Sequence, residues 1–286
     1  MLATIESSAI QGIDAYDIKV EVDVSAHLSY FAIVGLPDTA VNEAKERVRA
    51  AIKNSGLDFP LKRITVNLAP ADTKKQGPAF DLPVAVGILA ATGQVLTDSI
   101  EEWLFVGELA LDGGVRPVSG ILPIAVKARR DGKRKLVVPF ENAAEAAIVG
   151  DVEVYPVTSL LDCVSLLNDP IANRTPITAD PIAMMAQEDV SELDFADVKG
   201  QEHVKRALEV AAAGGHNILL VGPPGSGKSM LARRLPSVLA PMTLDEALEA
   251  TKRLLCRSSV EREKKSPQPR RARVPAIVQI GCISQN

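Results

Sequence analysis

One stretch of the chain, residues 217–229, has the residue types and spacing that most clearly predict chemistry. It reads NILLVGPPGSGKS, an apolar run followed by G-x-x-x-x-G-K-S. Glycines in this pattern can take backbone angles closed to other residues, so consecutive N–H groups can turn inward around a phosphate. Lys228 can then reach β- and γ-phosphates, and the Ser229 hydroxyl can ligate Mg²⁺.

The flanking sequence favours a phosphate site over an ordinary Gly/Pro-rich turn. Asn217 to Val221 predicts a buried strand of a parallel sheet, and Met230 to Leu235 predicts a helix. The N-terminus of that helix adds a partial positive charge behind the loop. The residues that we expect to bind phosphate are Gly222, Pro223, Pro224, Gly225, Ser226, Gly227, Lys228, Ser229 and Met230, with Ser229 also as the metal ligand.

The composition narrows the fold class and the compartment. Hydrophobic residues make up 47% of the 286 residues but aromatic residues only 3%, which favours α/β layers over an aromatic-cored β-sandwich. The net charge of −4 gives no global argument for nucleic-acid binding, so such a surface would be local. Three dispersed cysteines, no visible signal peptide and no membrane-length apolar run lead us to expect a cytoplasmic protein without membrane contact.

Alternating strand and helix patterns predict one α/β domain over residues 1–168. The expected strands are 17–25, 28–34, 64–68, 136–138 and 152–155. The expected helices are one that starts at Asp38 or Thr39 and stops at Gly56, followed by 80–92, 121–130, 142–149 and 159–167. A hairpin is expected over 104–118, with Asp112-Gly113-Gly114 as its turn.

A polar segment punctuated by prolines, residues 169–194, is expected to be a linker. A second domain is expected over residues 195–252, with a helix over 202–213 ahead of the phosphate loop. Another helix is expected over 243–252, because Thr243 and Glu246 form a capping-box pattern.

Two regions together resemble the YifB/ComM-type, magnesium-chelatase-like AAA+ ATPases. One is GQEHVKRALEVAAAGGHNILLVGPPGSGKSML at 200–231; the other comprises GLPD at 35–38, NLAPAD at 67–72 and GELALDGGVRPVSGILP at 107–123. The resemblance covers about residues 1–252. It implies a Lon-protease/ribosomal-S5-like α/β domain followed by a P-loop AAA+ α/β domain that binds ATP and Mg²⁺. Intact relatives form homo-hexamers, and one branch is associated with DNA branch migration.

The resemblance also assigns roles to residues outside the loop. Val198, Gly200 and Gln201 match the segment that lines the adenine pocket of AAA+ proteins, so Gln201 joins the expected nucleotide ligands. Arg233 and Arg234 are instead expected on a solvated helix face.

The comparison with Lon-type proteases predicts that the first domain does not hydrolyse peptides. Those proteases use a serine in a G-P-S-A-G context, whereas Gly77-Pro78 is followed here by Ala79. Leu122 stands where the activating lysine belongs, so we assign no catalytic residue. Lys74 and Lys75 could contact phosphate backbones, but solvated charge is the expectation for both.

Residues 253–286 depart from the family pattern. An AAA+ motor also needs a strand ending in acidic residues, a polar sensor and a neighbour's arginine. None is recognisable after Lys252, where the sequence becomes basic and aperiodic. We expect an aberrant, disordered tail read out of frame, which truncates the AAA+ domain. The competing interpretation is a genuine basic tail that binds nucleic acid.

The leading hypothesis is therefore an ATP-binding YifB/ComM-type protein related to DNA-processing motors. The missing parts predict a strand at 217–221 without neighbours, weak nucleotide affinity, negligible hydrolysis and no hexamer of this chain. A magnesium-chelatase-type motor subunit for metal insertion is one alternative, although such subunits resemble only the AAA+ half. A non-enzymatic interaction module formed by residues 1–167 is the other.

Overall fold

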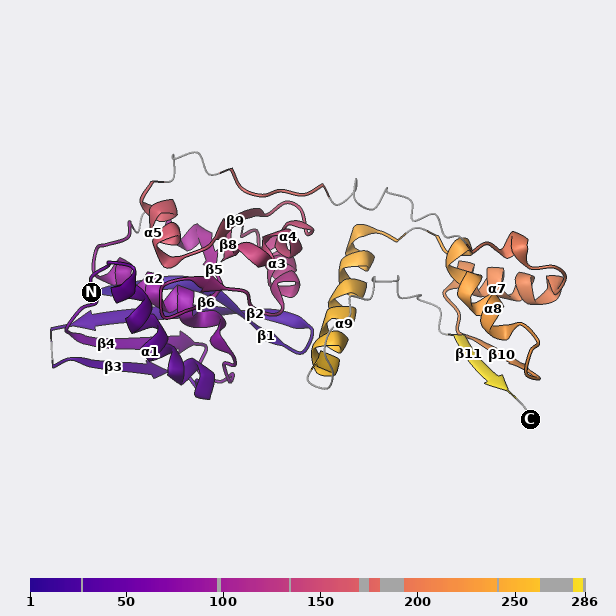
Figure 1. The fold of residues 1–286 in the computed structure, drawn as a ribbon, viewed down its shortest axis with the longest axis horizontal. Helices are drawn as coiled ribbons and strands as arrows, with labels where there is room; N and C mark the ends of the chain where they lie inside the picture. The colour runs from indigo at the N-terminus through magenta and orange to yellow at the C-terminus, as the bar shows by residue number, and fades with distance from the viewer. Residues whose placement is uncertain are drawn as a thin grey trace. The chain divides into compact units, whose positions relative to one another are not determined.

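A computed structural model describes residues 1–26, 28–96, 99–133, 135–169, 175–180, 193–240, 242–262 and 280–284, with backbone alone for 254–262 and 280–284. The chain divides into two compact units, Met1–Pro181 and Ile182–Asn286. Figure 1 shows the helices and strands of each unit as a ribbon.

A seven-stranded sheet forms the centre of the first unit, in the order β3-β4-β2-β1-β5-β8-β9. Its middle is an antiparallel run, β1 with β2 and β2 with β4, while the other neighbours are parallel. Side chains alternate between the two faces along β2 and β4, so one apolar face of each of these strands is buried. The strands are β1 (Leu2–Gln11), β2 (Asp14–Ser25), β3 (Tyr30–Val34), β4 (Arg63–Ala69), β5 (Trp103–Phe105), β8 (Lys135–Pro139) and β9 (Glu153–Val157).

Helices cover this sheet where their sequences are apolar. Helix α2 is buried along its whole length and packs against β1 and β2, whereas α1 buries one stripe that includes Val41, Val48 and Ile52. The Asp38 side chain caps α1 by accepting a hydrogen bond from the N–H of Val41 at 2.8 Å, so Asp38 rather than Thr39 is the N-cap. The helices are α1 (Thr39–Asn54), α2 (Asp81–Ala91), α3 (Ile121–Arg130), α4 (Ala143–Ala147) and α5 (Leu160–Asn168).

The central strand β1 is absent from the sequence-based prediction. Its buried positions include Ala3, Ser7 and Ala9, small residues that give only a weak apolar alternation. The Ser7 hydroxyl donates a hydrogen bond to the carbonyl of Phe105 at 2.9 Å, which ties β1 to β5. A buried serine is acceptable here because it has this partner.

The predicted hairpin at 104–118 is correct only near its turn. The short strands β6 (Glu108–Leu109) and β7 (Val115–Arg116) pair antiparallel, and Asp112 Oδ1 accepts from the N–H of Gly114 at 2.9 Å. Residues 104 and 105 instead belong to β5, because their fully buried side chains fit between β1 and β8.

The second unit contains the phosphate loop. Its core comprises Val198, Leu208, Ala211, Leu231 and Leu235. Thr243 and Glu246 form the predicted capping pair, with the N–H of Thr243 donating to Glu246 Oε2 at 2.8 Å. The elements are α7 (Glu202–Gly214), β10 (Ile218–Gly222), α8 (Lys228–Arg234), α9 (Leu244–Arg262) and β11 (Ile280–Ser284).

The structure differs from the expectation of a disordered tail over 253–286. Helix α9 continues past Lys252 to Arg262. Strand β11 pairs parallel with β10 from Ile218↔Ile280 to Gly222↔Ser284. The prediction that β10 has no neighbour is therefore wrong; the apolar run of β11 supplies one, although its sequence lies outside the part resembling the family. The rest of the predicted tail lies outside the described residues.

The predicted linker over 169–194 begins as part of the first unit. The N–H of Ile177 donates to the carbonyl of Val154 in β9 at 2.8 Å, which adds a bridge at that sheet edge.

No described helix has both the length and the apolar character needed to cross a bilayer.

Candidate phosphate-binding site

The loop between β10 and α8 has the backbone shape that its glycines predict. Gly225 has φ of +80° and Gly227 has φ of +84°, both in the left-handed region that favours glycine. Around Gly225 an added Cβ would meet nothing within 4 Å, so the backbone angle rather than space requires glycine there. Gly227 is the N-cap of α8.

Lys228 folds back over this loop. Its Nζ donates to the carbonyls of Gly222 at 2.9 Å and Pro223 at 2.8 Å, and contacts the Oγ of Ser226 at 3.2 Å. These three oxygens all come from the loop itself, so the ammonium lies against the backbone that the sequence assigns to phosphate. A partly buried cation held by neutral oxygens can exchange them for phosphate oxygens.

The remaining predicted site residues follow the loop into α8. Ser229 and Met230 lie exposed in the first turn, whereas Leu231 is buried in the core. The buried leucine anchors the helix and leaves the Ser229 hydroxyl on the solvent side. This arrangement is chemically suited to a hydroxyl that ligates a metal ion held by phosphates.

Gln201 reaches the loop from a distant part of the sequence. Its Nε2 donates to the carbonyl of Ser226 at 3.1 Å, and its backbone is left-handed, with φ of +58°. Of the two neighbours assigned with it, Val198 is buried in the core and Gly200 is exposed. The structure thus brings Gln201 to the loop but directs Val198 into the interior.

The expectation of a solvated face is wrong for Arg234, although Arg233 is exposed. Only 14% of the Arg234 side chain is exposed; its Nε donates to the carbonyl of Asp194 at 2.9 Å, and a guanidinium nitrogen lies 3.5 Å from Asp197 Oδ2. These contacts tie α8 to the segment that precedes Gln201. The sequence signal was present in the two aspartates, but helix position alone does not show which arginine turns inward.

In the first unit, the positions matched to a protease dyad carry no reactive group. Ala79 lies in a single turn of 3-10 helix, Pro78–Phe80, and Leu122 is buried in α3. Neither side chain can act as a nucleophile or a base.

Lys75 corrects the expectation of solvated charge. It is fully buried; its Nζ donates to the carbonyl of Pro70, and its own backbone bridges to the segment 36–38. Burial lowers the pKa of the Lys75 ammonium, although Asp72 acts in the opposite direction. The physical reason is that the loop folds over the side chain and supplies an acceptor from its own backbone.

Sequence reasoning also missed a buried ion pair at the start of α2. Asp81 is fully buried; Arg47 Nε lies 2.6 Å from its Oδ2 and an Arg47 Nη lies 3.1 Å from its Oδ1. The N–H of Leu109 also donates to this carboxylate at 3.2 Å. Burial raises the pKa of Asp81, and the bonds from Arg47 and Leu109 oppose that rise. A single acid at the head of an otherwise apolar helix was the available signal.

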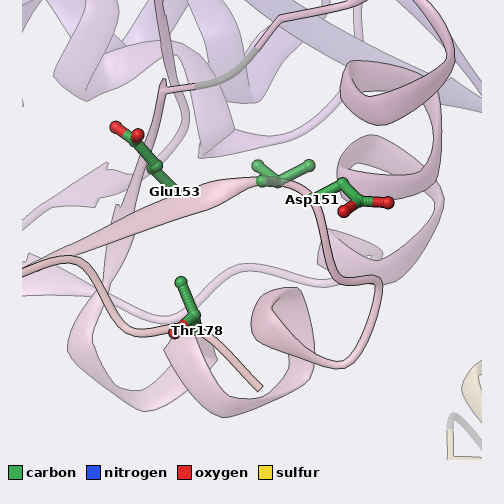
Figure 2. A pocket seen from close by; sticks show the side chains of 4 residues that line it. Asp151, Glu153 and Thr178 are labelled. Carbon is green, nitrogen blue, oxygen red and sulfur yellow. The ribbon is translucent and has the colours of Figure 1, made fainter. Parts of the chain in front are cut away.

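A shallow pocket in the first unit contains none of the predicted site residues. It is lined by Asp151, Val152, Glu153 and Thr178 (Figure 2). Figure 2 shows the carboxylates of Asp151 and Glu153 pointing away from one another, so they do not form a paired acid site. Within the described part of the chain, no three His, Cys, Asp or Glu side chains gather closely enough to hold a metal ion.

Two family models match the chain. Subunit ChlI of Mg-chelatase matches residues 20–142, and magnesium chelatase, subunit ChlI, matches residues 194–278. The second match includes the phosphate loop, Gln201 and Arg234.

Curated relatives agree with these family models. Competence protein ComM of Haemophilus influenzae is 45% identical over 250 residues, which cover 87% of this chain and 48% of the relative. The uncharacterized protein YifB of Salmonella typhimurium is 45% identical over 249 residues, with the same coverage. The chain therefore spans about half the length of these relatives.

A weaker similarity fits the first unit. Lon protease 2 of Bacillus subtilis is 24% identical over 128 residues, covering 45% of this chain and 22% of the relative. That similarity is consistent with the mixed α/β sheet and with the Lon-like first domain implied by the sequence. The two family models and the long matches to ComM and YifB lead to one assignment: the chain belongs to the YifB/ComM-type, magnesium-chelatase-like family.

Proposed function

We propose that the second unit binds ATP with Mg²⁺ at the phosphate loop and does not hydrolyse it. The observation that carries the proposal is the position of Lys228, whose ammonium lies on the carbonyls of Gly222 and Pro223. In a loop of this sequence, that is the charge that meets the β- and γ-phosphates. Binding then requires the ammonium to exchange neutral oxygens for anionic ones, which strengthens its hydrogen bonds.

The chain's own residues supply each kind of contact that Mg²⁺·ATP needs. Backbone N–H groups of residues 225–229 would hold phosphate, since the two left-handed glycines give this segment its turn. The Ser229 hydroxyl would ligate Mg²⁺, which polarises the phosphates when bound. The segment ending at Gln201 would lie on the side of the base, as in the family.

We propose that ATP is not hydrolysed because hydrolysis requires an acidic residue that the strand beside β10 does not supply. A carboxylate at the end of a neighbouring strand normally holds Mg²⁺ and orients the attacking water. Strand β11, which pairs with β10, reads Ile-Gly-Cys-Ile-Ser and includes no acid.

The biological setting is proposed from the relatives. One of them is named a competence protein, which supports a role in DNA processing and DNA as a partner. The net charge of −4 requires any DNA contact to come from a local basic surface.

The first prediction tests the phosphate loop with one substitution. Lys228→Ala should weaken binding of a fluorescent ATP analogue in the presence of Mg²⁺ by about tenfold or more, because a charge-assisted contact to phosphate is lost. The matched control is Arg206→Ala, which removes a cation from an exposed ion pair with Glu209 on α7. That variant should bind as the unmodified chain does.

Two results would contradict this proposal separately. Equal affinities of Lys228→Ala and the unmodified chain would show that the loop does not bind the nucleotide. Sustained phosphate release that Lys228→Ala abolishes would instead leave ATP binding intact and overturn the absence of hydrolysis.

A further inference from the structure

We infer that Gln201 is a positioning residue that holds the phosphate loop in shape through the carbonyl of Ser226, rather than a ligand of the base. The inference rests on the proposed function, because it deepens the role of the same site. It differs from the family-based assignment of Gln201, which places this residue beside adenine.

The backbone of Gln201 is fixed before its side chain acts. Gln201 is the N-cap of α7, and its carbonyl accepts from the N–H groups of Val204 at 2.9 Å and Lys205 at 3.1 Å. Its φ of +58° is one that glycine or asparagine would adopt at lower cost. Glutamine at a position that favours glycine suggests that its side chain makes a contact which offsets the backbone cost. The contact that the structure shows is the hydrogen bond to the loop.

The receiving end of this bond is the peptide that joins Ser226 to Gly227. Gly227 has φ of +84° and no Cβ, so it restrains the orientation of this peptide less than another residue would. A trans peptide is planar, with its C=O and N–H pointing in opposite directions. By holding the Ser226 carbonyl at 3.1 Å, Gln201 therefore directs the N–H of Gly227 away from itself. This N–H precedes Lys228 and belongs to the phosphate-binding backbone.

Ser226 also connects Gln201 to the phosphate-binding lysine. Its carbonyl accepts from Gln201, while its hydroxyl lies 3.2 Å from Lys228 Nζ. One residue thus carries both contacts, so releasing the carbonyl would disturb the lysine as well as the backbone.

The segment that carries Gln201 is itself fastened to the helix behind the loop. Arg234 of α8 donates to the carbonyl of Asp194 at 2.9 Å, and Val198 is buried in the core. Gln201 and Arg234 therefore attach the same segment at the loop and at the far end of α8. A side chain that bridges two fixed elements suits positioning better than capture of a ligand.

The test separates positioning from base recognition. Gln201→Gly keeps the left-handed backbone and deletes the amide, whereas Gln201→Glu keeps the shape but cannot donate at neutral pH. Inorganic tripolyphosphate, which has no base, competes with the fluorescent ATP analogue for the loop. Both variants should weaken ATP and tripolyphosphate by the same factor, about three- to tenfold for one hydrogen bond. Their thermal unfolding should match the unmodified chain, and Arg206→Ala is again the control.

Weaker ATP binding with unchanged tripolyphosphate binding would overturn the inference, because it would show that Gln201 contacts the base. Unchanged affinity for both ligands would overturn it as well. A second measurement needs no ligand: amide hydrogen exchange over residues 222–229 should be faster in both Gln201 variants. Equal exchange rates would reject the inference even if the unmodified chain bound no nucleotide, a result that would separately refute the proposed function.

Discussion

At the scale of single residues, Lys75, Lys228 and Arg234 are among the described cations that donate to backbone carbonyls. Lys75 donates to Pro70, Lys228 to Gly222 and Pro223, and Arg234 to Asp194. From the sequence, the motif around Lys228 predicts which residues surround it. Asp194 and Asp197 are available as partners for Arg234, but helix position alone does not show that Arg234 rather than Arg233 turns inward, and no such pattern marks Lys75. The residue type determines the charge of a side chain, whereas its burial depends on how the surrounding chain folds over it.

The nucleotide-site residues likewise divide into those whose position follows from the local sequence and those that depend on a contact distant in the sequence. The phosphate loop could be predicted because its backbone angles and lysine follow from local spacing. The role of Gln201 could not, since its contact with Ser226 joins residues 25 positions apart. Its assignment to nucleotide binding stays a prediction.

The buried pair of Arg47 and Asp81 provides a prediction at this scale. Arg47→Met should lower the free energy of unfolding by about 3–5 kcal/mol, because it leaves Asp81 buried without its cation. Adding Asp81→Leu should recover much of that loss, since no charge then remains unpaired. Urea unfolding of both single variants and the double variant measures the coupling.

Glu43→Ala is the control for this cycle. Glu43 lies 3.8 Å from the same arginine but is 66% exposed, so its loss should change stability by less than about 1 kcal/mol. Additive effects of the Arg47 and Asp81 substitutions would show that the pair is not coupled.

At the scale of elements, helices with a periodic apolar stripe and a recognisable end were predicted well. The bounds of α3, Ile121–Arg130, agree with the prediction, and α1 buries the expected stripe. Strand β1 was missed because alanine and serine occupy much of its buried face. The hairpin was extended too far because apolar residues of β5 continue its pattern, and only pairing with β1 and β8 distinguishes them.

The N-cap of α1 gives the prediction for this scale. Asp38 accepts from Val41 and, at 3.2 Å, from the N–H of Gly77, so it joins the helix start to the loop ahead of α2. Asp38→Ala should therefore cost about 1–2 kcal/mol of stability in urea unfolding. Asp38→Asn, which keeps an acceptor, should lose less.

Thr39→Ala serves as the matched substitution, because Thr39 is exposed and lies one position into the helix. Its stability should stay within about 0.5 kcal/mol of the unmodified chain. A larger loss for Thr39→Ala than for Asp38→Ala would reverse the assignment of the cap.

At the scale of the whole molecule, the sequence predicted two α/β regions, and the structure divides the chain at 181/182. The fold class follows from alternating elements together with the family resemblance. The strand β11 could not be predicted in the same way, because its residues follow the second family-model match, which ends at 278, and its partner β10 is distant in the sequence.

The first unit carries its own core, which leads to a prediction for residues 1–180. Its seven-stranded sheet and buried helices should give a cooperative unfolding transition without the rest of the chain. Trp103, the one tryptophan in the sequence, is buried there against Tyr155, so its fluorescence reports this unit. A gradual change in Trp103 fluorescence with urea, instead of a sigmoidal one, would contradict independent folding. The same measurement on residues 1–286 is the reference.

The burial of Lys75 has a consequence for any nucleic acid that reaches the loop at residues 70–77. An ammonium enclosed by protein cannot contact a phosphate, so it releases no counterion from the nucleic acid. Of the adjacent lysines, only Lys74 can therefore add to the salt dependence of binding. With one phosphate contact from Lys74, that pair would contribute about −0.9 to the slope of the logarithm of affinity against the logarithm of salt concentration for duplex DNA, rather than twice that value.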